Sequence, residues 1–528
     1  MEVPLLLNDF LRRAAKLYPN KTAIVDGNQR ITYREYQERC NQLAHALIAL
    51  GIKPGDRDCI LSPNSRYFLE SYYGVTQIGA ILVPLNYRLV AADHEYIIGH
   101  AGVKAVLVDY EYTKVVDEIR PNLPKVEHWI VADPSADKAT PAGWTDWDGL
   151  VSKQPTTATP VIEQDENDTT SINYTSGTTA RPKGVMLTHR NCYINAYNFI
   201  AHLRVHHDDI ELWTLPMFHA NGWGGPFAIT AMGGTHVVLR AIIGAEIYRL
   251  IEEEKVTFAC MAPAVLSTVL NYVDKDKHTI TTRPRFTVAG APPPAAFIER
   301  LEHELGWEFM QIYGLTETAP LLTVSVPDYQ NADGQDYSRR ARAGVEVIGC
   351  DIQVLDEQGK PVPMDGVAIG EVCARGNMVL KGYWEQPEET ARAIFDGFFH
   401  SGDLAVWDEF GNIHIVDRKK DVIISGGENI SSPEIEDALY KHPAVLECAV
   451  IGVPHERWGE TPKALVVLRA GMVATEAEII EFSRKHLAHF KAPTSVDFVE
   501  SLPRTATGKL QKFVIRDQYW KGATRRVN

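Results

Sequence analysis

Apolar and polar positions alternate with two different periods along the first third of the chain. Thr32 followed by Glu35 forms a capping box, which marks the start of a helix. Apolar residues then recur at helical spacing from Cys40 onwards until Gly51. Short apolar runs, which alternate with helix-like stretches, lie at residues 22–25, 58–61, 105–108 and 128–131. This alternation of strand-like and helix-like segments predicts an α/β fold.

The same alternation returns in the middle of the chain. Apolar runs at 256–262 and 285–290 are each followed by a helical pattern, so residues 184 to about 310 predict a second sheet lobe related to the first. From about residue 344 the pattern changes to short strands separated by turn signals such as DEQGK at 356–360, which predict a smaller β-rich subdomain. The rest of the chain has the length and alternation of a compact α+β unit.

The composition limits the class of protein. A chain of 528 residues exceeds what one hydrophobic core usually supports, so at least two domains are expected. The chain has 45% hydrophobic and 23% charged residues, which argues against a disordered chain, a collagen-like repeat or a membrane bundle. Its 68 acidic and 53 basic residues give a formal charge of -15, so a broad nucleic-acid-binding surface is not expected.

The cysteines and the hydropathy pattern predict a cytoplasmic protein. The seven cysteines are scattered and form no CxxC pair, as is usual in a reducing compartment. The N-terminal stretch has no basic region ahead of an apolar one, and no apolar run approaches the ~18 residues of a membrane-spanning helix. We therefore expect neither export nor an integral membrane segment.

Residues 171–189, SINYTSGTTARPKGVMLTH, contain a loop rich in small and hydroxylated residues. The loop follows a short apolar strand, and its small residues let backbone amides approach phosphate oxygens. Its hydroxyl groups add further donors and Lys183 adds a cation, so polyphosphate binding is the chemical interpretation. The Walker A pattern is absent, which disfavours an ordinary P-loop nucleotide hydrolase. For this loop taken alone, a polar surface turn is the alternative.

Five segments together carry a family resemblance. TSGTTARPKG (175–184) resembles the phosphate loop of the adenylate-forming superfamily of acyl-CoA synthetases, adenylation domains and luciferases. Four further motifs follow in the order of that family: QIYGLTET (311–318), HSGDL (400–404), DRKKDVIISGGENI (417–430) and PRTATGK (503–509). The resemblance spans nearly the whole chain and is strongest to the acyl-CoA synthetase, or fatty-acid:CoA ligase, branch. Ala180 stands where the family usually has Gly, and we expect only a small effect on loop flexibility.

The resemblance implies a domain organisation and a movement. It implies a large N-terminal domain, residues 1–419, with two related α/β sheet lobes plus a small β-rich subdomain. A small mobile α+β C-terminal domain, residues 420–528, would follow and rotate about a hinge at Lys420. Lys509 would bridge the substrate carboxylate and the α-phosphate while the adenylate forms, and would then withdraw. The SGGEN loop would replace it and bind CoA through Ser425, Gly426, Gly427 and Glu428. A homodimer is a further implication of the family.

The resemblance also assigns roles around ATP. Glu317 and Thr175 would hold Mg²⁺, which prefers hard oxygen ligands. Tyr313 would stack on adenine, and Asp403 with Arg418 would hold the ribose. Taken alone, Glu317 would equally suit a solvated surface acid, and Tyr313 an aromatic residue of the core. Asp403 and Arg418 would equally suit a structural salt bridge. The residues implied to bind ATP or AMP are Thr175, Ser176, Gly177, Thr178, Thr179, Lys183, Gly290, Ala291, Pro292, Gln311, Tyr313, Gly314, Thr316, Asp403, Arg418 and Lys509. The implied catalytic residues are Lys509, His219, Thr175 and Glu317.

Residues 216–227, PMFHANGWGGPF, have the composition of a movable pocket wall or of a packed glycine-rich loop. By resemblance, His219 lies beside the acyl carboxylate and Trp223 gates the acyl tunnel. The implied acyl pocket consists of His219, Trp223, Gly224 and Gly314. Amino-acid-activating relatives carry Asp where this chain has His219, because an α-ammonium group needs a buried acid. Amino-acid activation is therefore disfavoured.

The sequence thus predicts an AMP-forming acid:CoA ligase that uses ATP, Mg²⁺ and coenzyme A. A medium- to long-chain fatty acid is the expected substrate; an aryl or arylalkanoic acid and a short branched or sulfur-containing acid are the alternatives. No second carrier domain or Gly-x-Asp-Ser attachment site is present, so a CoA ligase is favoured over a carrier-protein acylating ligase. A non-catalytic nucleotide sensor is a further alternative, but Lys183, Glu317 and Lys509 are all retained.

Overall fold

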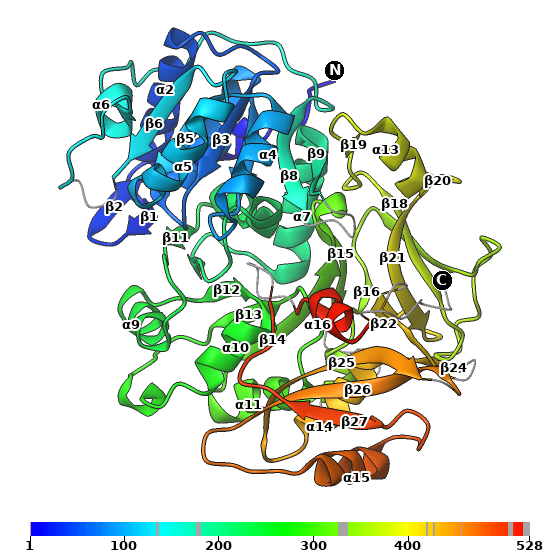
Figure 1. Cartoon of the computed structure of the whole chain (residues 1–528). Coiled ribbons are helices and arrows are strands. Elements are labelled where there is room, and N and C mark those ends of the chain that lie inside the picture. The colour runs from blue at the N-terminus through cyan, green and yellow to red at the C-terminus, as the bar shows by residue number, and fades with distance from the viewer. Residues whose placement is uncertain are drawn as a thin grey trace.

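The architecture consists of four β-sheets with helices packed around them (Figure 1). The structure of the chain is a computed structural model that describes residues 2–133, 137–175, 181–325, 336–418, 421–425, 428–455, 457–504 and 510–520. Within these ranges every helix is too short or too polar to serve as a membrane span.

The first sheet has nine strands in the order β16-β15-β14-β13-β12-β10-β11-β1-β2. These are β1 (Thr22–Asp26), β2 (Gln29–Thr32), β10 (Ile210–Leu212), β11 (Thr235–Val237), β12 (Phe258–Met261), β13 (Arg285–Val288), β14 (Glu308–Gly314), β15 (Leu321–Ser325) and β16 (Val345–Glu346). From β1 to β14 the neighbouring strands are parallel. Parallel strands need crossover connections, and here helices supply them: α9 (Gly244–Glu254), α10 (Pro263–Leu270) and α11 (Ala295–Glu304).

The second sheet has eight strands in the order β19-β9-β8-β4-β3-β5-β6-β7. These are β3 (Arg57–Leu61), β4 (Ile81–Leu85), β5 (Val103–Asp109), β6 (His128–Ala132), β7 (Thr145–Asp146), β8 (Thr169–Thr175), β9 (Lys183–Thr188) and β19 (Gly382–Tyr383). The helices of this part of the chain are α1 (Asn8–Leu17), α2 (Tyr33–Ala49), α3 (Arg66–Gly74), α4 (Ala91–Ala101), α5 (Thr113–Ile119), α6 (Trp147–Val151), α7 (His189–Leu203) and α8 (Gly225–Met232). Helix α2 begins at the capping box of Thr32 and Glu35, as its sequence predicts.

Two related α/β lobes are therefore confirmed, but they are not contiguous in sequence. The apolar run at 22–25 was expected with the strands of the first third. It forms β1, which instead pairs with β11 of the nine-stranded sheet, with Ile24 opposite His236. Strand β19 likewise joins the eight-stranded sheet from far along the chain. An apolar run predicts a strand but not its partner, because pairing depends on contacts remote in sequence.

The third and fourth sheets follow in chain order. The third contains β17 (Cys350–Leu355), β18 (Gly370–Gly376), β20 (Ile394–Phe395), β21 (Phe398–Trp407) and β22 (Ile413–Arg418), with α12 (Tyr337–Arg340) and α13 (Pro387–Ala393) nearby in sequence. The fourth contains β23 (Ile423–Ser425), β24 (Glu428–Ile430), β25 (Val445–His455), β26 (Gly459–Leu468) and β27 (Ser495–Phe498), with α14 (Ser432–Tyr440), α15 (Glu476–His486) and α16 (Lys512–Tyr519). Both the β-rich subdomain and the α+β unit are thus present.

The fourth sheet belongs to a small C-terminal domain with a core of its own. Its buried apolar residues pack in two clusters made entirely of residues after position 420, whereas one large cluster joins the three earlier sheets. In Figure 1 the small domain lies at the opposite end of the molecule from β3, β5 and β6. The expected boundary residue, Lys420, lies outside the described residues.

Candidate active site

A narrow pocket lies where the ends of β13 and β14 meet the segment η4 (His219–Gly224). It encloses about 40 Å³. Six residues singled out in the sequence line it: His219, Trp223, Gly290, Tyr313, Gly314 and Thr316. The other lining residues are Ala220, Ala289, Ile312, Leu315, Pro320 and Leu321. Segments that are far apart in the sequence therefore converge on one small space.

The parallel order of strands in the nine-stranded sheet determines where the pocket lies. Strands β13 and β14 are parallel neighbours, with Val288 opposite Gln311, so the residues after each strand emerge at the same edge. Crevices at the carboxyl ends of parallel strands are the usual ligand sites of such sheets. Gly314 is required at this edge, because a Cβ atom there would lie 1.7 Å from the carbonyl oxygen of Pro320. The absence of a side chain at Gly314 thus lets the end of β14 lie close to the backbone of Pro320.

The pocket wall formed by η4 has an unusual backbone. Four consecutive residues have left-handed φ angles: Ala220 (39°), Asn221 (46°), Gly222 (55°) and Trp223 (56°). For residues other than glycine this conformation costs about 1–2 kcal/mol each, so surrounding contacts must hold it. Asn221 Nδ2 donates to Ser171 Oγ at 2.7 Å, which ties η4 to strand β8.

Asn195 of α7 connects the two walls of the pocket. Its Nδ2 donates to the carbonyl oxygen of Trp223 at 3.1 Å, and its Oδ1 accepts from the amide of Leu321 at 3.0 Å. The side chain is fully buried. A Cβ atom at Gly224 would lie 2.2 Å from Asn195 Nδ2. Gly224, expected to line the acyl pocket, is instead buried against Asn195, because the amide of Asn195 occupies the space beside it.

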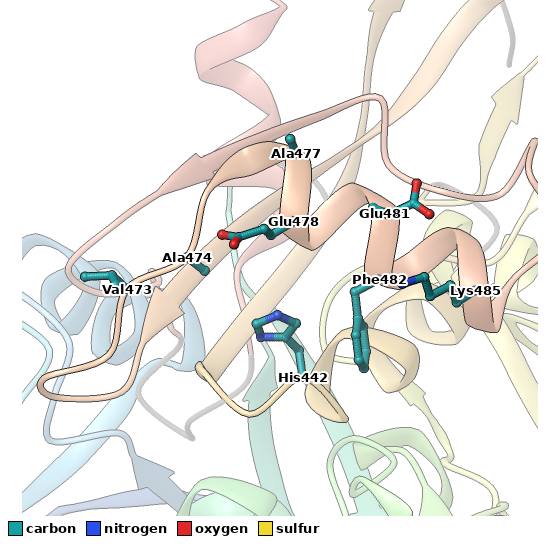
Figure 2. A pocket seen from close by; sticks show the side chains of 8 residues that line it. All are labelled: His442, Val473, Ala474, Ala477, Glu478, Glu481, Phe482 and Lys485. Carbon is teal, nitrogen blue, oxygen red and sulfur yellow. The ribbon is translucent and has the colours of Figure 1, made fainter.

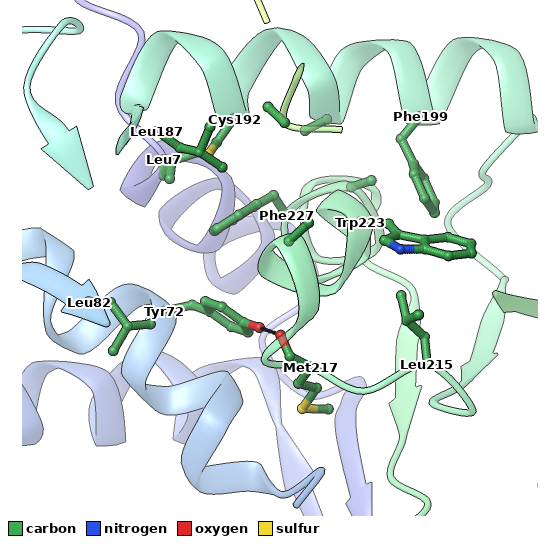
Figure 3. Close-up of a cluster of buried hydrophobic side chains, with 14 of the residues drawn as sticks. Leu7, Tyr72, Leu82, Leu187, Cys192, Phe199, Leu215, Met217, Trp223 and Phe227 are labelled. Atoms are coloured by element: carbon green, nitrogen blue, oxygen red, sulfur yellow. Dashed lines mark hydrogen bonds between the residues drawn. The ribbon is translucent and has the colours of Figure 1, made fainter. Parts of the chain in front are cut away.

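Buried side chains close the pocket behind Trp223. Figure 3 shows Trp223 within an apolar cluster that includes Phe227, Tyr72 and Leu215. Trp223 is 4% exposed, and the hydroxyl of Tyr72 donates to the carbonyl oxygen of Met217. Of the two alternatives for this glycine-rich segment, a packed loop describes the observed state.

The expected ribose-binding residues meet next to Tyr313. The Tyr313 hydroxyl donates to Asp403 Oδ2 at 2.7 Å, and Arg418 Nε lies 2.8 Å from Asp403 Oδ1. Asp403 and Arg418 face each other across the pairing of β21 with β22. The Asp403 carboxylate raises the pKa of the Arg418 guanidinium, and burial raises the pKa of Tyr313. Both oxygens of the Asp403 carboxylate are therefore held by neighbouring side chains.

Lys183 and Glu317 belong to one network around Tyr383. Lys183 Nζ forms an ion pair with Glu389 of α13 and lies 5.1 Å from the centre of the Tyr383 ring. The Tyr383 hydroxyl donates to Glu317 Oε1 at 3.0 Å. Hydrogen bonding to Lys183 lowers the pKa of Glu389, and burial raises the pKa of Tyr383. The cation and the acid expected at the triphosphate are thus linked by one aromatic residue.

Thr175 lies beside this network. It is the last residue of β8 and pairs with Lys183 across the β8–β9 ladder. The segment η6 (Thr316–Thr318), which carries Glu317, packs beside β9. The hydroxyl and carboxylate donors expected to hold Mg²⁺ therefore come from neighbouring elements.

The remaining residues expected to bind nucleotide or CoA lie away from the narrow pocket or outside the described residues. Gln311 is buried within β14, and Ala291 and Pro292 are exposed after β13, so none of the three lines the pocket. Ser425 ends β23 in the C-terminal domain. The other expected residues, and the side chain of Glu428, lie outside the described residues: Ser176, Gly177, Thr178, Thr179, Lys420, Gly426, Gly427 and Lys509.

Sequence reasoning missed Asn195, Tyr383 and Glu389. Asn195 is one of several polar residues in α7, and Tyr383 lies in an apolar run that resembles any short strand. Glu389 is one of two adjacent glutamates in α13, and only its pairing with Lys183 distinguishes it from Glu388. No local pattern marks these residues, because their partners lie on other elements.

A larger hollow of about 430 Å³ lies on the C-terminal domain (Figure 2). It opens between His442 and helix α15, where the His442 and Phe482 rings contact each other with centres 4.8 Å apart. None of the residues expected to bind substrate or nucleotide lines it. The narrow pocket is therefore the better candidate for the active site.

Comparisons with known proteins identify the family of the chain. The family described as AMP-binding enzyme matches residues 11–384, and the AMP-binding enzyme C-terminal domain matches residues 434–509. The chain is 38% identical to 4-hydroxybutyrate–CoA ligase 2 of Metallosphaera sedula, over 96% of this chain and 93% of that protein. It is also 38% identical to a 2-methylpropanoate–CoA ligase of Humulus lupulus, over 97% and 95%. The crystal structure of the anthranilate CoA ligase AuaEII in complex with anthranoyl-AMP superposes with a TM-score of 0.90 at 27% identity, covering 98% of both chains.

Proposed function

The chain belongs to the AMP-binding enzyme family and is an acid:CoA ligase, and from this premise we propose that its substrate is a short-chain carboxylic acid, straight or branched. This choice revises the sequence-based order, which put a medium- to long-chain fatty acid first. The relatives support the revision, because their acids are 4-hydroxybutyrate and 2-methylpropanoate.

The size of the pocket is the observation that carries the proposal. Its volume of about 40 Å³ is far below the roughly 300–1,000 Å³ of pockets that hold larger ligands. A long acyl chain needs a continued tunnel, but Trp223 and the buried cluster behind it fill that direction. A small acid requires the least rearrangement of these side chains.

An aryl acid is the second candidate. The anthranilate CoA ligase, with its TM-score of 0.90, favours it. A planar ring is larger than the observed pocket, so Trp223 and η4 would have to move to admit it. Movement of η4 would break the hydrogen bond between Asn195 and Trp223.

The proposed reaction has two steps. An oxygen of the acid carboxylate attacks the α-phosphorus of ATP, and the bond from that phosphorus to the bridging oxygen breaks as pyrophosphate leaves. The thiolate sulfur of CoA then attacks the acyl carbon, and the bond to the phosphate oxygen breaks as AMP leaves. The acid is already an anion, so the first step needs alignment and charge neutralisation but no general base.

The residues of the narrow pocket suit the first step. Lys183 would contact the phosphates, Asp403 and Arg418 the ribose, and Tyr313 the adenine. The Glu317 carboxylate and the Thr175 hydroxyl are hard oxygen donors that fit Mg²⁺, which would neutralise phosphate charge when bound. His219 lines the pocket where the acyl carboxylate would lie. Lys509 would complete this set by bridging the carboxylate and the α-phosphate.

The second step is proposed to use a rotated C-terminal domain. Residues 420–528 would turn about Lys420 relative to residues 1–419, removing Lys509 and bringing in the SGGEN loop with Ser425. A small domain with its own apolar core is suited to rotation as a rigid body. Lys509→Ala is therefore expected to impair adenylate formation more than acyl transfer from supplied acyl-adenylate.

The acid is identified by measuring CoA thioester formation with straight acids from acetate to stearate, branched short acids and benzoate-type acids. We expect the highest kcat/KM near butyrate or 2-methylpropanoate. Trp223→Ala should shift the preference towards larger acids, whereas Phe410→Ala, which removes an exposed aromatic side chain of the β-rich subdomain, should not. A stearate optimum in the unmodified enzyme would reject the short-acid proposal, and an unchanged profile in Trp223→Ala would reject the gate.

A further inference from the structure

Three side chains of the types that bind metal ions lie close together in the third sheet, outside the narrow pocket. Glu371 and Cys373 lie on β18 and His400 on β21, and their ligand atoms all lie within 4.8 Å of one another. Glu371 and Cys373 are two apart on one strand and so face the same side, and Cys373 pairs with His400 across the ladder. We propose that this cluster binds a divalent thiophilic metal ion such as Zn²⁺.

The two distances from His400 Nδ1 to the other ligand atoms suit a tetrahedral ion. Zinc binds sulfur at about 2.3 Å and nitrogen or oxygen at about 2.0–2.2 Å, so tetrahedral geometry separates sulfur from nitrogen by about 3.5 Å and nitrogen from oxygen by about 3.4 Å. Here Cys373 Sγ lies 3.3 Å and Glu371 Oε2 lies 3.6 Å from His400 Nδ1. The site supplies three ligands and leaves a fourth position for water.

His400 Nδ1 faces both the sulfur of Cys373 and the carboxylate of Glu371. A cation between the three ligand atoms would interact with all of them.

The ligands are held in place by their surroundings. The Phe395 ring stacks on His400 with centres 3.6 Å apart and planes 7° from parallel, which fixes the imidazole plane. Glu371 Oε1 accepts from the Gly402 amide at 2.9 Å, so Oε2 is directed towards His400. Cys373 is fully buried. Such supporting contacts orient the ligands of protein metal sites.

The ligands of this cluster favour a different ion from the Mg²⁺ expected beside ATP. Thiolate and imidazole favour zinc and related transition metals, whereas Mg²⁺ prefers oxygen ligands. The cluster also adjoins the turn that presents Asp403, because Ser401 Oγ donates to the Val372 carbonyl at 2.6 Å and Gly402 binds Glu371. A metal ion here would brace β18 against this turn.

Titration of the full-length protein with Co²⁺ tests the proposal without an activity assay. Tetrahedral Co²⁺ gives intense visible bands, and a cysteine ligand adds a sulfur-to-cobalt charge-transfer band in the near ultraviolet. We expect both at one equivalent, with displacement by Zn²⁺. Cys373→Ser should abolish the charge-transfer band and weaken binding about tenfold or more, whereas Cys350→Ser, on neighbouring β17, should change neither.

A second variant covers the case in which Cys373→Ser fails to fold. His400→Asn keeps the thiol, and it should weaken binding while leaving a charge-transfer band only at higher Co²⁺ concentration. The proposal is overturned if the unmodified protein shows no charge-transfer band, or if Cys350→Ser abolishes the band and Cys373→Ser does not. Because the readout is spectroscopic, its failure is independent of which acid the enzyme activates.

Discussion

Single residues control the charge around Lys183, which we propose contacts the phosphates of ATP. Lys183 is held by Glu389, and Tyr383 lies between Lys183 and Glu317. A triphosphate that binds Lys183 must therefore displace the Glu389 carboxylate. If Lys183 contacts the phosphates as proposed, we expect Glu389 and Tyr383 to influence ATP binding, although neither belongs to the motifs of the family.

Replacing Glu389 should strengthen ATP binding. In Glu389→Gln the ion pair with Lys183 is lost, so the lysine is available to phosphate. Partly exposed ion pairs contribute about 0.2–1 kcal/mol, so the KM for ATP should fall by up to about fivefold. Glu388→Gln is the matched control, because the Glu388 side chain is 88% exposed one residue away. A higher KM in Glu389→Gln would mean that Glu389 helps Lys183 to bind ATP.

Removing the Tyr383 hydroxyl should leave Glu317, the proposed Mg²⁺ ligand, less firmly positioned. Tyr383→Phe deletes a hydrogen bond to Glu317, and such bonds to charged groups contribute about 1.5–3 kcal/mol. We expect ATP–pyrophosphate exchange to slow about tenfold or more and to need more Mg²⁺ for half-maximal rate. Tyr337→Phe removes a hydroxyl that contacts His303 instead and is the control. An unchanged Mg²⁺ dependence would show that Tyr383 does not position Glu317.

Motifs predict some of these residues and not others. Lys183, Glu317, Asp403 and Arg418 stand in recognisable segments, and the described structure brings the last two into direct contact. Tyr383 acts through contacts with β9 and η6, which lie about two hundred and about seventy residues before it. Such contacts leave no local pattern in one sequence.

Among the elements, α7 and η4 together shape the side of the pocket where we propose the acyl group binds. The left-handed turn of η4 is retained by Asn195 from α7 and by Ser171 from β8. The glycines of this segment indicate an irregular backbone, but not that Asn221 and Trp223 share its left-handed conformation. That conformation depends on tertiary hydrogen bonds and could not be predicted from composition.

Loss of Asn195 should change which acids are accepted. Asn195→Ala removes hydrogen bonds to both Trp223 and Leu321, so η4 can relax. We expect kcat/KM for the best short acid to fall about tenfold, and the ratio between short and aryl acids to move towards the larger ones. Tyr197→Ala, from the exposed face of the same helix, should leave the ratio unchanged. If Asn195→Ala lowers stability but keeps the ratio, Asn195 has only a structural role.

For the whole molecule, buried histidines predict how stability depends on pH. Burial lowers the pKa of His94 and of His189 from 6.5 to about 4, and that of His236 to about 3. Between pH 6.5 and about 4 the unfolded chain binds protons that the folded chain does not. Stability is therefore complete above pH 6.5 and is lost as the pH falls, by up to about 1.4 kcal/mol per pH unit for each histidine.

Urea unfolding at a series of pH values measures this slope. His189 accepts from the Leu7 amide at Nδ1 and contacts Gln164 at Nε2, which fixes its neutral form. His189→Gln should reduce the slope below pH 6.5, whereas His206→Gln, at an exposed position, should not. If the free energy of unfolding falls equally steeply with pH in the unmodified protein, His189→Gln and His206→Gln, His189 is excluded as a source of the acid sensitivity.

The organisation of the whole molecule was predictable in outline. Periodicity predicted two α/β lobes, a β-rich subdomain and an α+β unit, and all four are present. The placement of β1 and β19 was not predictable, because a strand's partner is chosen by packing across the molecule. A medium- to long-chain fatty acid was the expected substrate, whereas relatives are named for short or aryl acids, such as 4-hydroxybutyrate and benzoate.

The central claim is that this chain makes CoA thioesters through an acyl-adenylate. The most direct test is to quantify AMP, pyrophosphate and thioester with a short acid, ATP and Mg²⁺, each with and without CoA. The account predicts AMP, pyrophosphate and thioester in equal amounts when CoA is present, and acid-dependent ATP–pyrophosphate exchange when it is absent. Formation of ADP and phosphate, or turnover to AMP and pyrophosphate with no thioester in the presence of CoA, would contradict it.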